Sequence, residues 1–546
     1  MDGRTYSGRE RRGRELITAV HHCVTYAALG GAVGLLASTA QAQVNCIPID
    51  TIDVTGVTLL TAQETDAALA PFRGECLDIE GINAALEAVT FLYVDKGYVT
   101  ARAYLPEQNI ADRSLDITVV EGELAAVTFN GEDKPVWEAI VFPNLIGKSA
   151  NLREIEQGLE IIRSMPAYTA TMEVSAGAED GQSVLEVTAV AERPWTARIG
   201  ANNQGTKGSG EYQGTVDLTY DHLLGLNESW SLSYTRGVET FPFSPDTGGA
   251  ATENIGGSVR FPYGRWTLTG NYKYSSYETD TVGPITTIGT DGWTHTVDVG
   301  LARVVHRNQN SKTTVSSTVE YRENANRIAE IEINASSRTL ASARLDLAHE
   351  RSIWGGSLTA RLGYEQGIAA FGAEEPDDEF SSSDPQFELG DFELSYFRPW
   401  QLDSGQISYT GVLRGQYSDD ALYGAYTLAI GGLSSVRGAK TLDFDATDAG
   451  LFAGNAGAVW RNDFAWTSKA GATKLFGSLQ TYAALDAGTL RVDDSDQARP
   501  LVGSAVGVRT VGGTVSVDVG YQEVLRMPND TSPPDGIFIA SLSARF

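Results

Sequence analysis

The sequence predicts a signal peptide, two small α+β domains and then a 16-stranded antiparallel transmembrane β-barrel. Three observations support this fold class. The N-terminus has the layout of a secretory signal. Two consecutive stretches share the order strand, helix, helix, strand, strand. From residue 194 onward, polar and apolar side chains alternate almost throughout, as in strands with one apolar face.

The composition excludes two other classes of protein. The 546 residues include 70 Asp and Glu against 41 Lys and Arg, which gives a formal net charge of −29. Binding to a phosphate backbone requires clustered Lys and Arg, so this balance argues against a nucleic-acid partner. The mean hydropathy of −0.17 argues against a bundle of membrane helices. A membrane barrel remains compatible with it, because the polar lumen and loops dilute the apolar outer face.

Residues 1–42 are predicted to be a signal peptide. Five arginines form a basic beginning, a mostly apolar stretch runs from Val24 to Ala37, and Ala40-Gln41-Ala42 supplies the small residues of a cleavage site. A membrane anchor is the alternative interpretation, but the apolar run is short and rich in glycine. We therefore expect the mature protein to be exported.

Export determines how the cysteines are interpreted. Cys23 lies in the signal peptide, which leaves Cys46 and Cys76 in a compartment that oxidises thiols. We predict a disulfide between these two, with two free buried thiols as the alternative. The sequence contains no CxxC, HExxH or GxSxG motif. It therefore indicates no metal site, no cofactor and no catalytic residue, and we expect the protein not to be an enzyme.

Residues 43–122 and 123–193 are predicted to be the two α+β domains. Apolar residues recur at helical spacing in the two helices of each domain and at spacing two in its strands. The elements expected in the first domain are a strand near Ile52–Val57, helices at Ala62–Leu69 and Ile79–Val94, and strands at Tyr98–Leu105 and Leu115–Val120. Those expected in the second are a strand at Leu124–Phe129, helices at Val136–Val141 and Leu152–Met165, and strands at Thr169–Val174 and Ser183–Val190.

These two domains resemble POTRA domains, the polypeptide-transport-associated modules of exported proteins. The segment Gly97-Tyr-Val-Thr-Ala-Arg-Ala-Tyr-Leu-Pro106-Glu-Gln108, followed by Val119-Val-Glu-Gly122, is similar to the first POTRA domain of two-partner secretion translocators, the haemolysin-activator and filamentous-haemagglutinin-transporter type. An edge strand can pair with an extended substrate, whereas a strand inside the sheet would be only structural. The candidate docking residues are Tyr98, Val99, Thr100, Ala101, Arg102, Ala103, Tyr104 and Leu105.

Residues 194–546 are predicted to form the barrel. Near residue 218, for example, Val216, Leu218 and Tyr220 alternate with Asp217 and Thr219. Lipid outside and a wet lumen inside produce this pattern, with a soluble sandwich as the alternative. The final segment ends in Phe546 and resembles the C-terminal signal of bacterial outer-membrane barrels. Strands are expected near 195–203, 211–221, 229–236, 254–262, 266–276, 293–305, 312–323, 338–349, 356–366, 386–397, 405–417, 450–464, 475–487, 500–509, 513–522 and 536–546.

The longest connection, at about 418–449, is expected to fold into the lumen. Its Val436-Arg437-Gly438 resembles the loop tip of the superfamily of outer-membrane insertases and translocators, although Ala439 stands where these usually have an aromatic residue. A second stretch, on the strand near 475–487, resembles the strand whose aspartate faces the lumen in that family. Here Asp486 alternates with Leu485 and so faces the lumen if the leucine faces lipid. We predict that Arg437 and Asp486 form an ion pair. An exposed arginine and an unpaired lumen carboxylate are the alternative.

The resemblance runs from about residue 50 to Phe546 and implies a translocator of the bacterial outer membrane with its POTRA domains in the periplasm. It implies that a large unfolded exoprotein is captured by these domains and secreted through the barrel. Outer-membrane lipid and the barrel-assembly machinery are the other expected partners. An insertion factor of the same superfamily and a passive porin are the alternatives. The mature chain enters the first domain soon after the predicted cleavage site, so we expect no N-terminal plug helix.

Overall fold

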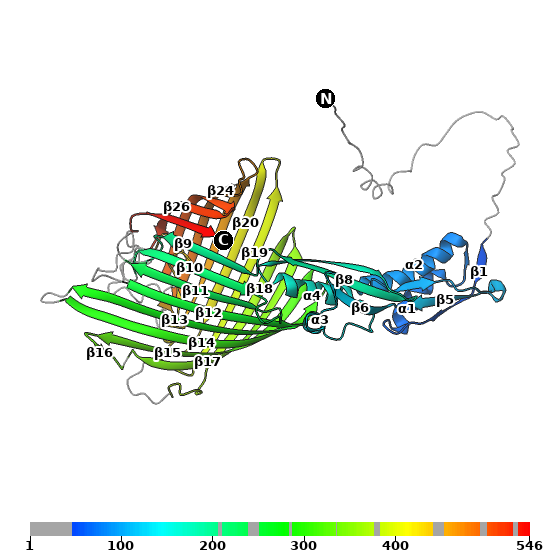
Figure 1. The fold of residues 1–546 in the computed structure, drawn as a ribbon, viewed down its shortest axis with the longest axis horizontal. Coiled ribbons are helices and arrows are strands. Elements are labelled where there is room, and N and C mark those ends of the chain that lie inside the picture. The colour runs from blue at the N-terminus through cyan, green and yellow to red at the C-terminus, as the bar shows by residue number, and fades with distance from the viewer. Residues whose placement is uncertain are drawn as a thin grey trace, which may run out of the picture.

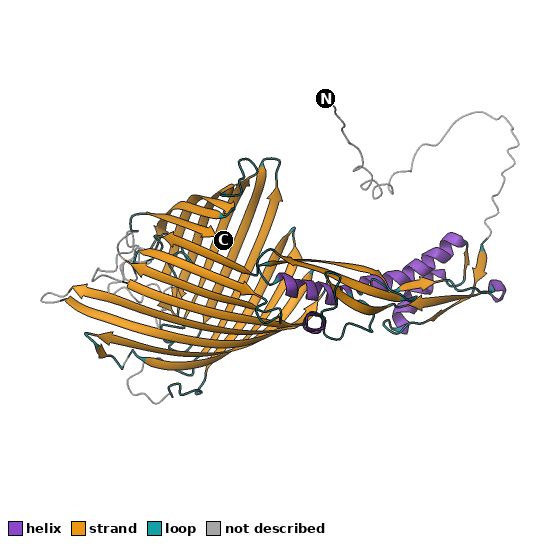
Figure 2. Ribbon diagram, viewed as in Figure 1, coloured by secondary structure: helices purple, strands orange, loops and turns teal. Residues whose placement is uncertain are grey.

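The computed structural model describes residues 46–205, 210–238, 251–282, 287–334, 336–375, 383–439, 453–491, 499–527 and 533–546. The predicted signal peptide, and the expectation about a plug helix ahead of the first domain, lie outside these residues. Two α+β domains follow one another away from one end of a barrel (Figures 1 and 2). No helix in the described ranges combines the length and the apolar character needed to cross a membrane.

The first domain packs two helices on a three-stranded sheet. The sheet has the order β2-β5-β4, with β2 (Thr51–Thr55) parallel and β4 (Arg102–Tyr104) antiparallel to β5 (Ser114–Val120). Helices α1 (Ala62–Leu69) and α2 (Ile79–Asp95) lie where the sequence predicts them. Both helices begin at a polar cap, because Thr61 and Asp78 accept hydrogen bonds from backbone N–H groups of the first turn. Two short 3-10 turns complete the domain, η1 (Ala70–Phe72) and η2 (Ile110–Asp112).

A second, two-stranded sheet in this domain was not predicted. Strand β1 (Ile47–Ile49) pairs with β3 (Glu75–Leu77). A disulfide joins Cys46 to Cys76 at this sheet, with their Cα atoms 5.2 Å apart. The sheet was missed because three-residue strands carry too little alternation to be distinguished from loops. The disulfide fastens the first described residue to the segment between α1 and α2.

The strand predicted at Tyr98–Leu105 is wrong in its extent. Only Arg102–Tyr104 pair with β5, while Tyr98 makes an isolated bridge to Asn151 of the second domain. The reason lies at the end of α2, where Tyr98 N donates to Tyr93 O and Gly97 adopts φ +92°. This is a helix-capping turn, so the first residues after Gly97 complete the helix end before the chain reaches the sheet.

The second domain has the same layers. Its sheet has the order β6-β8-β7, built from β6 (Glu123–Phe129), β8 (Gln182–Ala191) and β7 (Tyr168–Ala176). Helices α3 (Pro135–Val141) and α4 (Leu152–Arg163) cover it. The buried core between the helices and the sheet includes Phe129, Trp137, Phe142, Ile162 and Leu185. The predicted order of elements is thus present in this domain.

Sixteen long strands among the described residues close into an antiparallel barrel, in agreement with the sequence prediction. The two-residue strand β16 (Ile331–Glu332) extends the edge of β15, and β27 pairs with β9 to complete the circle. The strands are β9 (Trp195–Asn202), β10 (Tyr212–Asp221), β11 (Ser229–Val238), β12 (Ala251–Tyr263), β13 (Trp266–Val282), β14 (Thr287–Arg307), β15 (Ser311–Ile328), β17 (Arg338–Ile353), β18 (Gly356–Gly367), β19 (Glu388–Gln401), β20 (Gly405–Tyr417), β23 (Ala456–Ser468), β24 (Gly477–Arg491), β25 (Arg499–Gly512), β26 (Val515–Arg526) and β27 (Ile537–Arg545).

Some strand bounds differ from those predicted. Strand β14 has 21 residues, where the alternation indicated 293–305, and β23 begins at Ala456 rather than near residue 450. About ten residues suffice to cross the apolar layer, so β14 extends beyond it. Figure 1 shows β13 and β14 projecting past their neighbours at the end of the barrel away from the α+β domains. Apolar alternation ends where both faces of a strand are wet, which is why the sequence underestimated these strands.

The second domain is attached to the near end of the barrel, which we define as the end that contacts it. The polar face of α4 meets the short turns between barrel strands. Glu154 accepts from Arg265 Nη2 at 2.5 Å, and Glu160 accepts from Arg307 Nη1 at 2.6 Å and from Lys312 Nζ at 2.8 Å. The backbone contributes as well, because Gly264 N in the β12–β13 turn donates to Ile140 O at 2.8 Å.

Glu160 makes this attachment dependent on pH. Burial works to raise the pKa of Glu160, but hydrogen bonds from Lys312 and Arg307 outweigh burial and hold that pKa below its ordinary value. A carboxylate with a lowered pKa contributes stability above its ordinary pKa. The contribution is lost as the pH falls through the lowered pKa. Acid is therefore expected to loosen the contact between α4 and the barrel.

We predict that Glu160→Gln raises hydrogen exchange in α4 and the β14–β15 turn at neutral pH, because the two cations lose their charged acceptor. The wild type should approach the exchange of this variant as the pH falls, whereas the variant should change little over the same range. Glu173→Gln, on an exposed face of β7 away from the barrel, is the matched control. Equal exchange in Glu160→Gln and the wild type at neutral pH would show that the ion pairs contribute nothing to the attachment.

Candidate functional site

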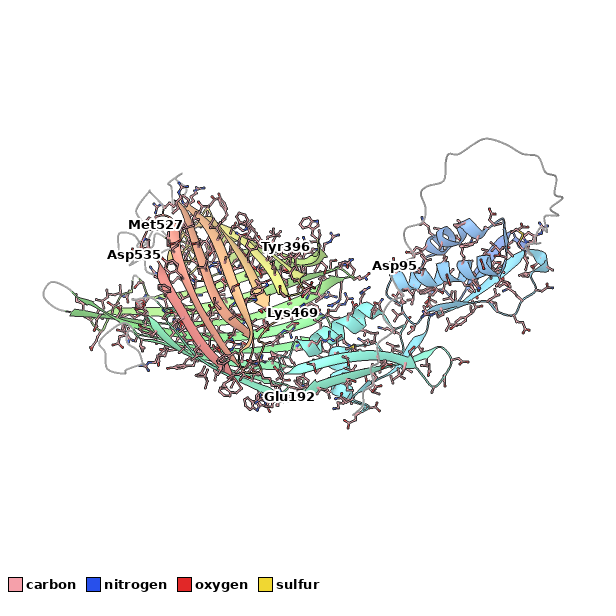
Figure 3. All side chains as sticks on the ribbon, turned by 90° about the horizontal axis from the view of Figure 1, so that it is seen from above. Asp95, Glu192, Tyr396, Lys469, Met527 and Asp535 are labelled. Atoms are coloured by element: carbon pink, nitrogen blue, oxygen red, sulfur yellow. A yellow bond between two sulfur atoms is a disulfide. The ribbon has the colours of Figure 1, made fainter. Side chains whose placement is uncertain are left out.

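The described part of the connection after β20, residues 418–439, lies against the inner wall of the barrel. Gln416 Nε2 on β20 donates to Tyr426 O at 2.8 Å, and Arg414 Nη2 donates to Ser434 O at 3.0 Å. Within the connection, the short strand β21 (Leu428–Ala429) pairs with β22 (Ala453–Gly454), which lies just before β23. Residues 440–449 of the predicted loop lie outside the described residues. Figure 3 shows Met527, near this region, at the barrel end remote from the α+β domains.

At the loop tip, Arg437 and Asp486 form the pair that the sequence predicts. Arg437 Nε donates to Asp486 Oδ2 at 2.6 Å and Nη2 donates to Oδ1 at 2.8 Å, a two-pronged contact. The backbone N–H of Arg437 donates to the same carboxylate at 3.1 Å. Arg437 is only 6% exposed and Asp486 is fully buried. On β24, Leu479 and Leu485 face outward, as the alternation predicted for a lumen-facing aspartate.

A second carboxylate in this cluster was missed from the sequence. Asp463 on β23 accepts from Arg437 Nη1 at 2.6 Å and from Nη2 at 3.1 Å. Arg461 lies 4.0 Å from Asp486, so the cluster has two cations and two carboxylates. Outward-facing Trp460 and Phe464 share one parity and Asp463 has the other, which was a signal for a lumen position. Asp463 lies within the strand predicted near 450–464, but parity gives only the side of the strand that it faces and not the loop residue that reaches it.

The glycine after Arg437 is required by close packing. Gly438 has φ +92°, and a Cβ there would lie 2.3 Å from the carbonyl carbon of Glu523 on β26. Its N–H donates to Gln522 Oε1 at 3.3 Å. The wall is equally close at Gly503 on β25, where a Cβ would lie 1.9 Å from Arg437 O. The tip therefore sits against the backbone of the wall, and larger residues at these glycines would push it away.

An apolar cluster surrounds the tip. Val436 is fully buried, and Ala439, which replaces the usual aromatic residue, is buried with it. The cluster joins the loop to four strands of the wall and comprises Ile430, Val436, Ala439, Val459, Leu490, Leu501, Val524 and Met527. The ion pair thus lies next to a dry patch inside an otherwise polar lumen, which reduces screening of its charges.

The loop has a second attachment, which the sequence analysis did not identify. The ring of Tyr426 lies 4.3 Å from that of Phe387, centroid to centroid, and is buried with Leu340. Arg322 on β15 lies over the ring of Tyr426 at 5.8 Å, a cation–π contact. This attachment involves β15 and β17, whereas the tip contacts β23 to β26. The loop is therefore held at two parts of the wall and crosses the space between them.

A separate charge network lines the wall at β17, β18 and β19. Arg344 donates to Asp346, to Glu365 and to Asp391, at 2.5 to 3.0 Å. Arg361 donates to Asp346 and Asp391 at 3.1 and 2.8 Å. Three carboxylates share two guanidinium groups here, so this wall presents paired charges to the lumen. Among the described residues no group of His, Cys, Asp and Glu has a metal-binding arrangement.

The candidate docking strand lies in the first domain, remote from the loop tip. Strand β4 is an edge of its sheet, but Ala103 N already donates to Thr90 Oγ1 of α2 at 3.1 Å. Apolar side chains are nevertheless exposed beside it, namely Tyr104 at 54% and Phe91 on α2 at 72%. The exposed apolar side chains thus come from β4 and α2 together, and the eight-residue strand predicted from the sequence is not formed.

The segment Val119-Val-Glu-Gly122 connects the loop before α1 to α2 through the carboxylate of Glu121. Glu121 accepts from Thr58 N at 2.6 Å, from Leu59 N at 2.8 Å and from Tyr93 OH at 2.8 Å. Its backbone oxygen accepts from Ser149 Oγ of the second domain at 2.7 Å. The segment thus contacts both the loop before α1 and the second domain, and the partly buried Glu121 carboxylate is engaged by three hydrogen bonds.

Comparison with known proteins supports one family. The family described as haemolysin secretion/activation protein ShlB/FhaC/HecB matches residues 181–510, and the POTRA domain of ShlB type matches residues 47–122. The chain is 33% identical over 488 residues to the outer membrane transporter CdiB of Escherichia coli, covering 86% of this chain and 78% of the relative. It is 28% identical over 393 residues to the hemolysin transporter protein ShlB of Serratia marcescens, covering 72% and 69%.

The fold is similar to that of a solved relative. The structure of CdiB from Escherichia coli matches with a TM-score of 0.84 and 31% identity, covering 93% of this chain and 92% of the other. CdiB from Acinetobacter baumannii matches with a TM-score of 0.74 at 20% identity, which supports the fold.

We predict that Arg437→Ala leaves the barrel assembled but releases the loop tip, because losing one partner of a buried ion pair costs about 3–5 kcal/mol. Conductance in planar bilayers should become larger and less steady than in the wild type. Asp463→Asn should have a smaller effect, since Asp486 keeps its three contacts with Arg437.

Arg361→Ala is the matched control, because this lumen arginine makes its contacts with the wall and not with the loop. Arg361→Ala should therefore lack the unsteady conductance expected of Arg437→Ala. If Arg437→Ala conducts like the wild type while Arg361→Ala does not, the Arg437–Asp486 ion pair is not what holds the loop in the lumen.

Proposed function

The chain belongs to the haemolysin secretion/activation protein family ShlB/FhaC/HecB, and we propose that it captures an unfolded exoprotein at its POTRA domains and passes it outward through the barrel. Its class is that of a two-partner secretion transporter of the outer membrane, with the POTRA domains in the periplasm. Membership of this family sets aside the insertion factor and the passive porin. The family is one of transporters.

One observation carries the proposal beyond the family. The second POTRA domain is fastened to the barrel entrance by ion pairs between α4 and the turns, with Glu160 contacting both Arg307 and Lys312. A domain held at the entrance can deliver a captured chain to the lumen without releasing it. We assign residues 43–122 and 123–193 to the two POTRA domains and 194–546 to the barrel.

The proposed capture surface is the region between α2 and the β4 edge in the first POTRA domain. Tyr104 and Phe91 give it exposed apolar side chains, while the short β4 edge adds little backbone pairing because Ala103 N already donates to Thr90 Oγ1. Main-chain pairing reads little of the guest's sequence, while apolar contacts select unfolded segments. A large exoprotein in its unfolded form has the extended apolar segments that this surface requires.

The proposed passage is the lumen, from which the loop tip must withdraw. The charge network of Arg344 and Arg361 gives the wall paired charges, which a hydrated chain can pass without binding strongly. Folding of the exoprotein outside the cell is the proposed driving force. Outer-membrane lipid around the barrel and the barrel-assembly machinery are the remaining proposed partners.

Removing residues 46–193 tests the function as a whole. The truncated protein should still assemble as a heat-modifiable barrel, because its backbone hydrogen bonds close within the barrel. It should secrete no exoprotein, measured by the amount released into the medium. Secretion at the wild-type level would refute capture by the POTRA domains.

The capture surface itself is tested by Phe91→Ser combined with Tyr104→Ser. Both side chains are exposed, so the domain should remain folded, while secretion falls because apolar area for the guest is lost. Ile79→Ser is the matched control: Ile79 is 79% exposed on the same helix, about 16 Å from Thr90 along its axis. An equal loss of secretion in the control would show that the effect is not specific to this surface.

A further inference from the structure

The turn between β10 and β11, residues 222–228, places its charge inside and its leucines outside. Glu228 is fully buried and its carboxylate accepts from the backbone N–H of Leu224, from Leu226 N at 2.9 Å and from Trp230 Nε1 at 3.4 Å. Leu223, Leu224 and Leu226 are 57%, 56% and 38% exposed. A turn in water normally has the opposite arrangement, because burying a carboxylate is costly and exposing leucine is unfavourable.

This turn continues the lipid-facing surface of the barrel. In the register of the sheet, Tyr220 lies opposite Trp230 on one side and Trp195 on the other. The three aromatic side chains share the outward parity of Leu218, and they lie at the periplasmic end of their strands. Tryptophan and tyrosine gather at the boundary between lipid and water in membrane proteins. The first exposed leucine, Leu223, therefore lies three residues beyond Tyr220 of this aromatic boundary.

The same turn is attached to the second POTRA domain. Trp137 Nε1 of α3 donates to His222 Nε2 at 2.8 Å, and the two rings lie 4.7 Å apart, centroid to centroid. Asp221 accepts from Ala167 N at 2.7 Å. A pocket of about 580 Å³ lies between the turn and this domain, lined by Trp137, Tyr168 and His222 among others. The contacts of Trp137 with His222 and of Ala167 with Asp221 thus hold the β10–β11 turn and the second POTRA domain together.

We propose that the leucine turn, residues 222–228, is a membrane-contact site that inserts its leucines among the phospholipids of the inner leaflet of the outer membrane. The buried carboxylate of Glu228 holds the turn in the shape that presents them. Through His222 and Trp137 the leaflet then sets the position of the second POTRA domain relative to the membrane. The inference rests on the outer-membrane location and not on capture of the exoprotein, so it can fail or hold independently of the proposed secretion route.

The test places a fluorophore in the turn of the full-length protein. Since Cys46 and Cys76 are bonded to each other, Leu224→Cys gives a single free thiol in the mature chain for an environment-sensitive label. The protein is reconstituted in vesicles of phosphatidylethanolamine and phosphatidylglycerol, with or without brominated acyl chains. We expect brominated lipid to quench this label as strongly as a label at Leu218→Cys on the lipid face, and severalfold more than one at Gln309→Cys in the polar β14–β15 turn.

Two results would overturn the proposal. Quenching at Leu224→Cys no stronger than at Gln309→Cys would place the turn in water. A label that is unquenched by lipid, but shifts to shorter wavelength when an unfolded exoprotein fragment is added, would make the turn a protein-binding surface instead. Heat-modifiability checks that each variant is assembled, and Leu223→Cys replaces any Leu224→Cys protein that fails this check.

Discussion

The constraint on which the rest of the structure depends is that no backbone N–H or C=O group can remain unpaired in the hydrocarbon layer. Sixteen strands satisfy it by closing on themselves, with β27 paired to β9. A closed wall, however, also encloses a continuous polar lumen. A protein of this kind must therefore control its lumen with parts that are not strands of the wall, and it must present substrate at one opening.

The in-folded loop occupies the lumen and is held there by two attachments of different chemistry. The tip uses a buried ion pair, Arg437 with Asp486 and Asp463, set beside an apolar cluster. The Tyr426 attachment uses aromatic and apolar contacts on another part of the wall. Buried ion pairs add little net stability but demand one geometry, so the tip has a defined seated position. Apolar contacts are less directional, so the second attachment tolerates movement of the tip.

Presentation of substrate at one opening depends on the near end of the barrel, where α4 and the β10–β11 turn fasten the POTRA domains to it. The contacts of Glu154 and Glu160 with Arg265, Arg307 and Lys312 are electrostatic, whereas the contact of Trp137 with His222 is aromatic. Both place the domains relative to the entrance. The acidic balance of the chain is compatible with this arrangement, because Arg265, Arg307 and Lys312 are placed where carboxylates of α4 need partners.

The sequence by itself determined the classes of element and the side of each strand that faces water. Alternation identified the sixteen strands, and it placed Asp486 on the lumen side, because parity along a strand is a local property. The tertiary structure alone decided which residues meet across the lumen. Asp463 and Arg322 became partners of the loop because β23 and β15 lie within its reach, and no local pattern records that distance. It also decided the extent of β4, which a helix cap shortens, and the buried position of Glu228, which depends on the turn around it. These features depend on contacts between distant segments, whereas alternation reports only the environment of each segment in turn.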